Sequence, residues 1–300
     1  MRKYVSCFIG YLRYERNYSV HTVNAYMNDL QQFISFIEER EALEGESFPV
    51  DRIDADVIRQ WMMGLMKQSL SSASVNRKLS ALHSLFRYFV RQGIIKKHPF
   101  ALLSGPKKTK VLPCFIREKE VEKMLAEENF TQDFEGIRNR LMLEMLYETG
   151  IRCSELVGIK DTDVDLEAMA LKVTGKRNKQ RLVPFAGRLK EMIVYYINVR
   201  TRDVEAVSQS FFVRKDGRPL SSAIVYYAVK KKLSDIPMLS KRSPHVLRHT
   251  FATSMLNDGA EISAVRNLLG HSSLASTSVY THVTFEELKK VYNAHPRAKK

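Results

Sequence analysis

Hydrophobic residues in the first hundred positions recur three or four residues apart, which is the spacing of an amphipathic helix. From Val23 to Ile37 the apolar side chains fall on one helix face, and three other segments show the same spacing. Ser19 and Asp54 stand where two of these segments begin, and both residue types cap helix N-termini well. The predicted helices cover about residues 2–16, 20–37, 55–68 and 73–92.

The rest of the chain adds one region with the alternating pattern of strands. Over residues 169–185, ALKVT and QRLVPF flank the basic turn GKRNK, which is typical of a β-hairpin. Helical spacing returns at about residues 116–125, 137–148, 187–199, 221–233, 244–257 and 261–269, with shorter helices after residues 153 and 285. The pattern therefore predicts a mainly α protein with a small antiparallel β-sheet in its second part.

Between these two parts the helical pattern lapses. Residues 96–113, KKHPFALLSGPKKTKVLP, contain three prolines, a glycine and five lysines, a composition typical of a linker. We therefore predict two domains, an N-terminal helical domain over residues 1–105 and a C-terminal domain over residues 106–300.

The net charge of the chain indicates which class of partner it binds. The formal net charge is +15 and the isoelectric point is about 9.7, which favours a polyanion such as a nucleic acid. Residues 1–106 carry a net charge of +4 and the remainder +11, so most of the basic surplus lies in the predicted C-terminal domain.

Cysteine usage and hydropathy indicate the cellular compartment in which the protein is expected. Cys7, Cys114 and Cys153 form an odd, scattered set, which fits a reducing environment better than a disulfide framework. The first ten residues are too polar for a signal peptide, and no apolar run approaches the roughly 20 residues of a membrane span. We expect a cytoplasmic protein that is not inserted in a membrane.

The most distinctive chemistry lies in residues 243–282, SPHVLRHTFATSMLNDGAEISAVRNLLGHSSLASTSVYTH. Ser243-Pro244 predicts the start of a helix that ends near Gly259, and a second helix ends at Gly270. On the first helix one face is apolar and the other is polar. The apolar face holds Val246, Leu247 and Phe251, and the polar face holds His245, Arg248 and His249.

The polar residues in and after these helices suit chemistry on phosphate. A guanidinium group binds phosphate through two parallel hydrogen bonds, and a histidine can donate a hydrogen bond or move a proton near neutral pH. His271 follows the second helix, and the hydroxyl of Tyr280, nine residues later, is a candidate covalent nucleophile. The set indicates phosphoryl transfer to a tyrosine without a metal.

The order and spacing of these motifs resemble the tyrosine recombinases, the phage integrase family. SPHVLRHTFATSML, LLGHSS and VYTHV are similar to the Xer type of that family. ETGIRCSEL resembles the family's first arginine motif, with Arg152 at the catalytic arginine and Glu155 at the nearby acidic residue. Lys176 matches the lysine of the β-hairpin. The resemblance covers nearly the whole chain and is weakest over residues 1–100.

The resemblance implies a fold and a reaction. The N-terminal domain would be the four-helix, SAM-like core-binding domain, and the C-terminal domain the tyrosine recombinase catalytic fold. Tyr280 would attack a DNA phosphodiester to give a 3′-phosphotyrosyl link and a free 5′-hydroxyl. Because that link conserves the phosphodiester energy, no cofactor is expected. The implied catalytic residues are Arg152, Lys176, His245, Arg248, His271 and Tyr280, with Glu155 in a supporting role.

The resemblance also implies partners and a biological setting. These are double-stranded DNA at a recombination site, a homo- or heterotetramer with a second tyrosine recombinase on two duplexes, and a septal DNA translocase as an activator. An enzyme of the Xer type would resolve chromosome or plasmid dimers during cell division and chromosome partition.

Other functions remain open at the level of sequence. The enzyme could be the integrase of a mobile element, or a relaxing topoisomerase that uses the same tyrosine chemistry. Residues 244–269 also resemble a helix-turn-helix, so a non-enzymatic DNA-binding protein is a further alternative. A metal at His245 and His249 is disfavoured, because the pair lacks the glutamate of HExxH and a third ligand.

The last segment predicts an interaction between copies. Phe285, Leu288 and Val291 recur on one side of a short helix, which needs a surface to cover its apolar stripe. The following Asn293 to Arg297 resembles the Xer carboxy terminus, which in that family docks on the neighbouring protomer. We expect the same head-to-tail contact here.

Overall fold

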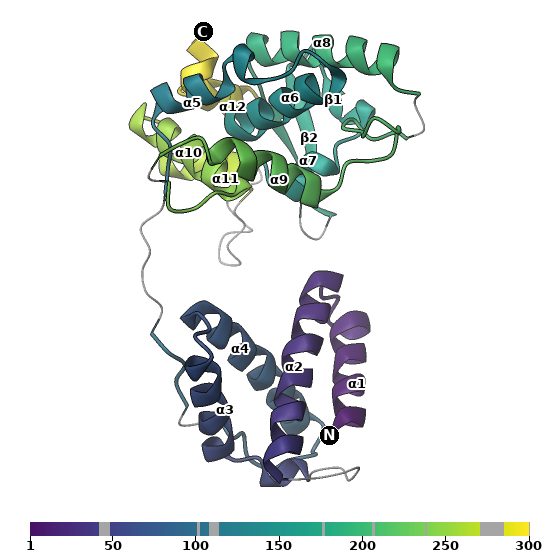
Figure 1. Ribbon diagram of the computed structural model, residues 1–300, viewed down its shortest axis with the longest axis vertical. Coiled ribbons are helices and arrows are strands. Elements are labelled where there is room, and N and C mark those ends of the chain that lie inside the picture. Colours follow the sequence, from purple (N-terminus) through teal and green to yellow (C-terminus); the bar gives the residue numbers. More distant parts are fainter. Residues whose placement is uncertain are drawn as a thin grey trace. The chain divides into compact units, whose positions relative to one another are not determined.

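Two compact units make up the computed structural model, Met1–Val111 and Leu112–Lys300 (Figure 1). The structure describes residues 1–41, 49–100, 103–107, 114–175, 178–205, 208–237, 239–270 and 285–299. The predicted domain boundary after residue 105 falls close to the division between the units and stays a prediction.

The N-terminal unit contains the four predicted helices. They are α1 (Arg2–Gly10), α2 (Val20–Glu41), α3 (Ala55–Lys67) and α4 (Ser72–Arg91), with a π-helical turn at Tyr11–Glu15 and a 3-10 turn at Val50–Arg52. Asp54 caps α3 by accepting hydrogen bonds from the backbone N–H groups of Asp56 and Val57. The helix predicted over residues 2–16 is α-helical up to Gly10 and continues as the π-helical turn. Buried aromatic side chains fill the core between these helices.

A buried ion pair joins α2 to α4. Lys78 is only 4% exposed, and its Nζ lies 3.0 Å from Oδ1 of Asp29. Arg77 pairs with the other oxygen of the same carboxylate. Burial of Lys78 thus depends on a carboxylate almost fifty residues away in sequence.

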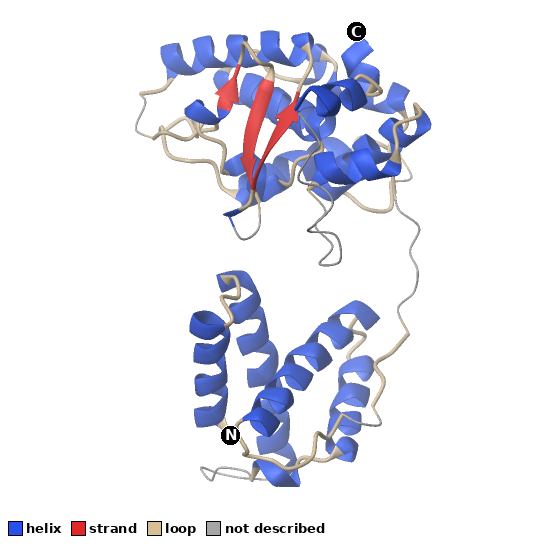
Figure 2. Ribbon diagram, turned by 180° about the vertical axis from the view of Figure 1, so that it is seen from behind, coloured by secondary structure: helices blue, strands red, loops and turns tan. Residues whose placement is uncertain are grey.

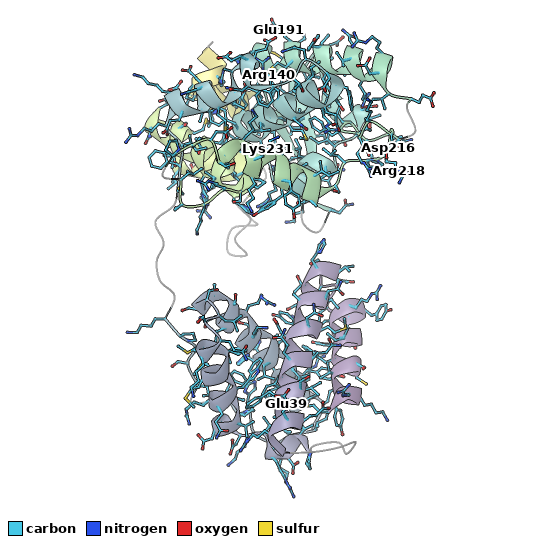
Figure 3. The ribbon with its side chains drawn as sticks, in the orientation of Figure 1. Glu39, Arg140, Glu191, Asp216, Arg218 and Lys231 are labelled. Carbon is cyan, nitrogen blue, oxygen red and sulfur yellow. The ribbon has the colours of Figure 1, made fainter. Side chains whose placement is uncertain are left out.

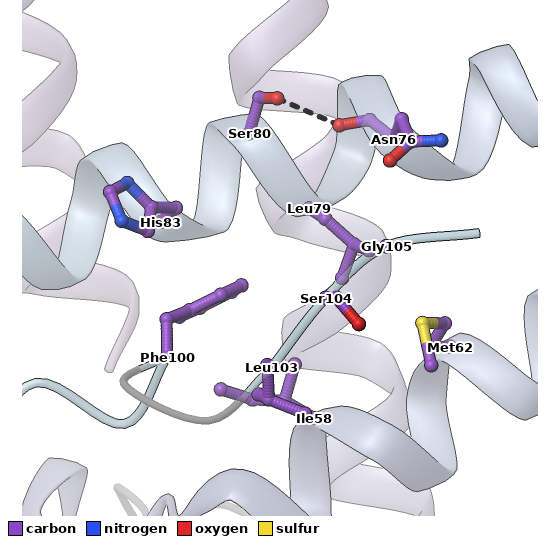
Figure 4. Close-up of a pocket in the computed structure, with 10 residues that line it drawn as sticks. All are labelled: Ile58, Met62, Asn76, Leu79, Ser80, His83, Phe100, Leu103, Ser104 and Gly105. Carbon is purple, nitrogen blue, oxygen red and sulfur yellow. Dashed lines mark hydrogen bonds between the residues drawn. The ribbon is translucent and has the colours of Figure 1, made fainter. Parts of the chain in front are cut away.

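The segment after α4 folds back onto the N-terminal unit. It closes a pocket of about 270 Å³ between α3 and α4, and Ser104 and Gly105 line this pocket (Figure 4). The Asn76 side chain donates a 2.8 Å hydrogen bond to the carbonyl of Pro106. The beginning of the predicted linker is thus held against this unit as far as Pro106.

The C-terminal unit surrounds one buried helix, α6 (Phe134–Thr149). The predicted stripe from Ile137 to Leu146 is buried, and so are Leu143 and Tyr147 on other faces, because helices pack around α6 on several sides. The other helices are α5 (Glu118–Leu125), α7 (Cys153–Val157), α8 (Gly187–Asp203), α9 (Ser222–Leu233), α10 (Pro244–Asn257), α11 (Ile262–Leu269) and α12 (Phe285–Tyr292). Short 3-10 turns lie at Glu127–Asn129, Asp161–Asp163 and Pro296–Lys299.

A three-stranded antiparallel sheet lies in the same unit (Figure 2). The predicted hairpin forms β2 (Ala170–Thr174) and β3 (Gln180–Pro184), with Lys172 opposite Leu182. The sequence pattern missed β1 (Val164–Asp165), which pairs with β2. The end of the hairpin nearest the turn lies on the side of the unit lined by α9, α10 and α11 (Figures 1 and 2).

The tail packs on its own unit. Helix α12 lies against β3 and α11, and Tyr292 is 3% exposed. His295 is fully buried, with its ring stacked on Phe251 of α10 at 5.2 Å between centroids. Arg297 is buried as well, and its Nη2 lies 3.8 Å from Oε2 of Glu144 on α6. In this single chain the tail therefore covers α6 and α10, and docking on a neighbouring protomer stays a prediction.

Candidate active site

The first candidate arginine follows the end of α6. Gly150 closes that helix in the left-handed conformation, with φ of 61°, and Arg152 stands at the N-cap of α7. The Arg152 backbone N–H donates to Glu155 Oε2 at 2.8 Å, and Nη1 donates to Oε1 of the same carboxylate at 2.7 Å. Glu155 therefore caps α7 and holds the Arg152 guanidinium, whose side chain is 35% exposed.

The second candidate arginine, Arg248, is almost buried. On α10 it is 6% exposed, and its two Nη groups donate to the carbonyls of Gly150 and Leu269, each at 2.6 Å. Both carbonyls belong to helix ends, of α6 and α11. Burial, followed by repulsion from Arg152, lowers the pKa of Arg248 to about 10, so the group remains charged at neutral pH. The structure thus brings Arg248 to the backbone two residues before Arg152.

His245 lies on the exposed face of α10, three residues before Arg248. Partial burial and then the neighbouring cations, Arg248 first, lower the pKa of His245 below its usual value. A neutral imidazole beside two guanidinium groups can accept a proton. The predicted apolar face of α10 is confirmed, since Val246 and Phe251 are buried.

Three predicted residues, Lys176, His271 and Tyr280, lie outside the described residues. The chain that leads to two of them is described. The N–H of Gly175, just before Lys176, donates to the carbonyl of Lys179 at 2.8 Å. Gly270, just before His271, ends α11 with φ of 64°. Arg152, Glu155, His245 and Arg248 are thus the predicted residues that the structure brings together.

Arg181 on β3 is a further residue of the site, and the sequence motifs did not indicate it. Its two Nη groups bind the two oxygens of Glu155, each at 3.0 Å, and its Nε donates to the carbonyl of Leu268 at 2.8 Å. The sequence did contain a signal, because Arg181 and the buried Val183 share one face of an alternating strand. An arginine on the buried face of a strand needs an acceptor, which Glu155 provides.

Glu155 is ionised despite its burial. Desolvation acts to raise its pKa, but hydrogen bonds and charge from Arg181, together with those from Arg152, outweigh it and hold the pKa at about 2. A carboxylate between two guanidinium groups also reduces the mutual repulsion of the cations around it. The site is therefore a cationic centre with one fixed negative charge.

Metal sites and membrane spans are absent from the part of the chain that the structure describes. No three His, Cys, Asp or Glu residues are grouped there so as to hold a metal ion. Within the same residues, every helix is too short or too polar to cross a lipid bilayer.

Two family models match the chain. The phage integrase family model matches residues 114–287, and the model of the phage integrase N-terminal SAM-like domain matches residues 5–93. The matches correspond to the two compact units.

Curated relatives match over the full length. The tyrosine recombinase XerC of Listeria innocua serovar 6a is 39% identical over 97% of this chain and 97% of its own. The tyrosine recombinase XerC of Staphylococcus carnosus is 40% identical over 100% of this chain and 99% of its own.

Solved structures share the fold. A post-cleavage complex of the XerH site-specific recombinase with a palindromic difH substrate has a TM-score of 0.73 at 23% identity, covering 93% of this chain and 81% of that one. A lambda integrase dimer bound to a core site has a TM-score of 0.70 at 20% identity, covering 91% of this chain and 95% of that one. Together with the family models and the full-length relatives, this fold shows that the chain belongs to the phage integrase family and is a tyrosine recombinase of the Xer type.

Proposed function

We propose that this enzyme recombines DNA at a specific site by using Tyr280 as the nucleophile. The observation that carries the proposal is that Arg248, inside α10, binds the carbonyl of Gly150, two residues before Arg152, while His245 lies on the same helix as Arg248. Two guanidinium groups in one partly buried centre suit the equatorial oxygens of a phosphodiester in its transition state. A helix-turn-helix that only binds DNA has no need of such a centre.

Each step of the reaction has an assigned residue. The Tyr280 oxygen attacks phosphorus and gives its proton to His245, while the bond from phosphorus to the 5′-oxygen breaks. Lys176 gives that oxygen a proton, so the products are a 3′-phosphotyrosyl enzyme and a 5′-hydroxyl. His271 donates a hydrogen bond to the phosphate. Attack by the 5′-hydroxyl of another strand reverses these steps and completes the exchange, with no net hydrolysis.

The partner is double-stranded DNA, and the assembly is a tetramer on two duplexes. The net charge of +15 supports a polyanionic partner. The XerH and lambda integrase structures are complexes with DNA, and the lambda structure is a dimer on its site. We propose that the N-terminal unit binds the core of the site and that a second tyrosine recombinase, identical or paralogous, completes the tetramer.

The biological role that we propose is resolution of chromosome or plasmid dimers, in the cytoplasm and under control of a septal DNA translocase. Full-length similarity to two XerC proteins supports this role over integration of a mobile element. The fragments that become covalently attached to the enzyme, recovered from sheared genomic DNA and sequenced, distinguish the two. A single chromosomal site supports dimer resolution, and the ends of a mobile element contradict it.

Covalent trapping on a nicked suicide duplex tests the chemistry. The nick lets the short strand diffuse away after cleavage, so a denaturing gel shows the protein attached to the 3′ end. The wild type is expected to form this adduct in EDTA as well as in Mg²⁺. Tyr280→Phe is expected to bind the duplex with unchanged affinity and to form none. An adduct with the Phe variant, or loss of the wild-type adduct in EDTA, contradicts the mechanism.

A further inference from the structure

Arg181 joins three segments that carry catalytic residues. From β3 it holds Glu155 of α7 through two hydrogen bonds, each of 3.0 Å, and through Nε it holds the carbonyl of Leu268 at 2.8 Å. All three nitrogens of its guanidinium group donate to Glu155 or to the carbonyl of Leu268, so its hydrogen bonds hold parts of the protein together. We infer that Arg181 is a positioning residue for strand cleavage, an inference that rests on the proposed function.

The first segment is α7, which carries Arg152. Glu155 accepts from Arg152 on one side and from Arg181 on the other, so a single carboxylate connects the two guanidinium groups. Two parallel hydrogen bonds fix the plane of a carboxylate as well as its position. Arg181 therefore sets the orientation of the acceptor that aims Arg152.

The second segment is the end of α11, immediately before His271. Arg181 binds the carbonyl of Leu268, and Arg248 binds the next carbonyl, that of Leu269. Gly270 lies against the same guanidinium, because a Cβ there would be 3.1 Å from Nη1 of Arg181. Two arginines thus fix the chain as it leaves α11.

The third segment is the hairpin turn that carries Lys176. Arg181 lies on the strand that leaves this turn, and Gly175 lies where the chain enters it. A Cβ at Gly175 would lie 3.3 Å from Oε1 of Glu155, so the start of the turn sits close over the carboxylate. Contacts of Arg181 and Glu155 therefore hold the base of the turn against α7.

The inference predicts a loss of rate without loss of DNA affinity. Arg181→Met keeps an unbranched apolar side chain and removes the guanidinium group. We expect single-turnover cleavage on the suicide duplex to fall by about 100-fold, since misplacing a catalytic group by about 1 Å can cost that much. Half-site affinity in a gel shift is expected to stay within about twofold, because no phosphate contact is removed.

A pH profile separates positioning from a general structural role. Without Arg181 the burial of Glu155 is opposed by the hydrogen bonds of Arg152 and the nearby charge of Arg248, which is less than before, so the pKa of Glu155 rises. Cleavage by Arg181→Met is therefore expected to decline as the pH is lowered through a range in which the wild type keeps Glu155 ionised. In Arg181→Met/Glu155→Gln this acid decline is expected to disappear.

Three further variants complete the test. Lys172→Met is the matched control, because Lys172 is a cation on the neighbouring strand whose 2.9 Å ion pair with Asp163 lies outside the site. It is expected to cleave at the wild-type rate. Arg181→Lys keeps the charge but lacks the planar fork, and it is expected to be slow as well. If Arg181→Met fails to fold, Arg181→Lys decides the question alone.

The outcomes are distinct for the two proposals. If the wild type forms no adduct, the proposed function is wrong. If the wild type forms the adduct and a folded Arg181→Met or Arg181→Lys cleaves at the same rate with the same pH profile, the positioning role of Arg181 is overturned.

Discussion

At the scale of single residues, Arg248 has a structural role that Arg152 does not share. Arg248 satisfies two buried backbone carbonyls, whereas Arg152 is one-third exposed and, among the described residues, its side chain binds Glu155 alone. Removing a partner from a buried carbonyl costs about 1–3 kcal/mol. Replacing Arg248 should therefore lower the free energy of unfolding more than replacing Arg152 does, although both arginines should be needed for cleavage.

The first prediction compares Arg152→Ala with Arg248→Ala. Each is expected to slow cleavage by about 10²–10³, the usual effect of losing one contact to a developing charge. Only Arg248→Ala is expected to lower the free energy of unfolding clearly, because Gly150 and Leu269 lose their donor. Single-turnover cleavage at saturating protein and urea unfolding measure the two effects. Equal stability of the variants contradicts the carbonyl role.

The second prediction concerns Glu148 beneath the tail. Burial, aided by Glu144, raises the pKa of this carboxyl to about 8 from 4.5, although the charge of Arg297 and the hydroxyl of Tyr292 act to lower it. The folded chain therefore keeps a proton that the unfolded chain loses above pH 4.5. Stability is expected to be fully present below pH 4.5 and to fall as pH rises towards 8.

Glu148→Gln is expected to remove that fall and to raise the melting temperature of the C-terminal unit at neutral pH. We expect the melting temperature to rise by about 2–8 °C, which corresponds to a gain of roughly 1–2 kcal/mol in the free energy of unfolding for a unit of this size. His295 opposes the trend only at lower pH, because burial lowers its pKa to about 3 and stability falls as pH drops below 6.5. Arg297 faces the same cluster, and its charge acts to lower the pKa of Glu148. Calorimetry from pH 5 to 9 gives the profile, with the exposed Glu191→Gln as control (Figure 3).

Site residues divide into those that sequence could predict and those that it could not. Arg152, Glu155 and Arg248 stand in motifs, and the structure brings them together. Arg181 and Glu148 were not predicted, because burial of a charged group depends on partners that are distant in sequence. Lys78 shows the same limit in the N-terminal unit, because its burial depends on Asp29 of another helix.

At the scale of elements, helix ends were predictable because their signals are local. Asp54, Ser71 and Gly150 act at the helix termini where their residue types are favoured. Strand β1 was not predicted, because two residues carry no period and form a strand only by pairing with β2. Similarly, α6 showed one apolar stripe, whereas its burial on all sides comes from the helices around it.

The third prediction tests the helix end that supports both arginines. Gly150 has φ of 61°, and a Cβ there would lie 2.5 Å from Phe251 and 2.9 Å from Leu269. Gly150→Ala is therefore expected to destabilise the C-terminal unit by about 1–3 kcal/mol, through strain and overpacking. Cleavage should fall as well, because the carbonyl of Gly150 holds Arg248.

Gly187 is the matched control for this variant. It begins α8, its φ is not in the left-handed region, and a Cβ there would meet nothing within 4 Å. Gly187→Ala is expected to leave melting temperature and cleavage nearly unchanged. If Gly150→Ala behaves like Gly187→Ala in urea unfolding, the close packing at this helix end is not important for stability.

At the scale of the whole molecule, the two units have separate cores and can be followed separately. Trp61 is the one tryptophan of the sequence, and it is buried in the N-terminal unit. Its fluorescence therefore reports unfolding of that unit, while calorimetry detects both. The sequence pattern indicated this division through the lapse of helical spacing after residue 96. The pattern also indicated that the tail needs a covering surface, but it could not identify that surface as the tail's own unit.

The last prediction is truncation after Thr284. The deletion removes Tyr292, His295 and Arg297, which are buried against the catalytic unit, and it leaves Glu148 uncovered. We expect a lower melting temperature for the C-terminal unit and an unchanged Trp61 transition. If the same tail also docks on a neighbouring protomer, the truncated chain binds half-sites normally but loses cooperativity on full sites.

Gel-shift titrations on half-sites and full sites, with cleavage measured in parallel, separate these roles. Tyr292→Ala is the milder companion, because it removes one buried ring and keeps the length of the tail. A lower melting temperature with intact cooperativity would mean that the tail belongs only to its own unit. Loss of cooperativity in both variants means that the same apolar surface of the tail packs on its own unit in a single chain and on the neighbouring protomer in the assembly. Assembly on DNA would then exchange the first contact for the second.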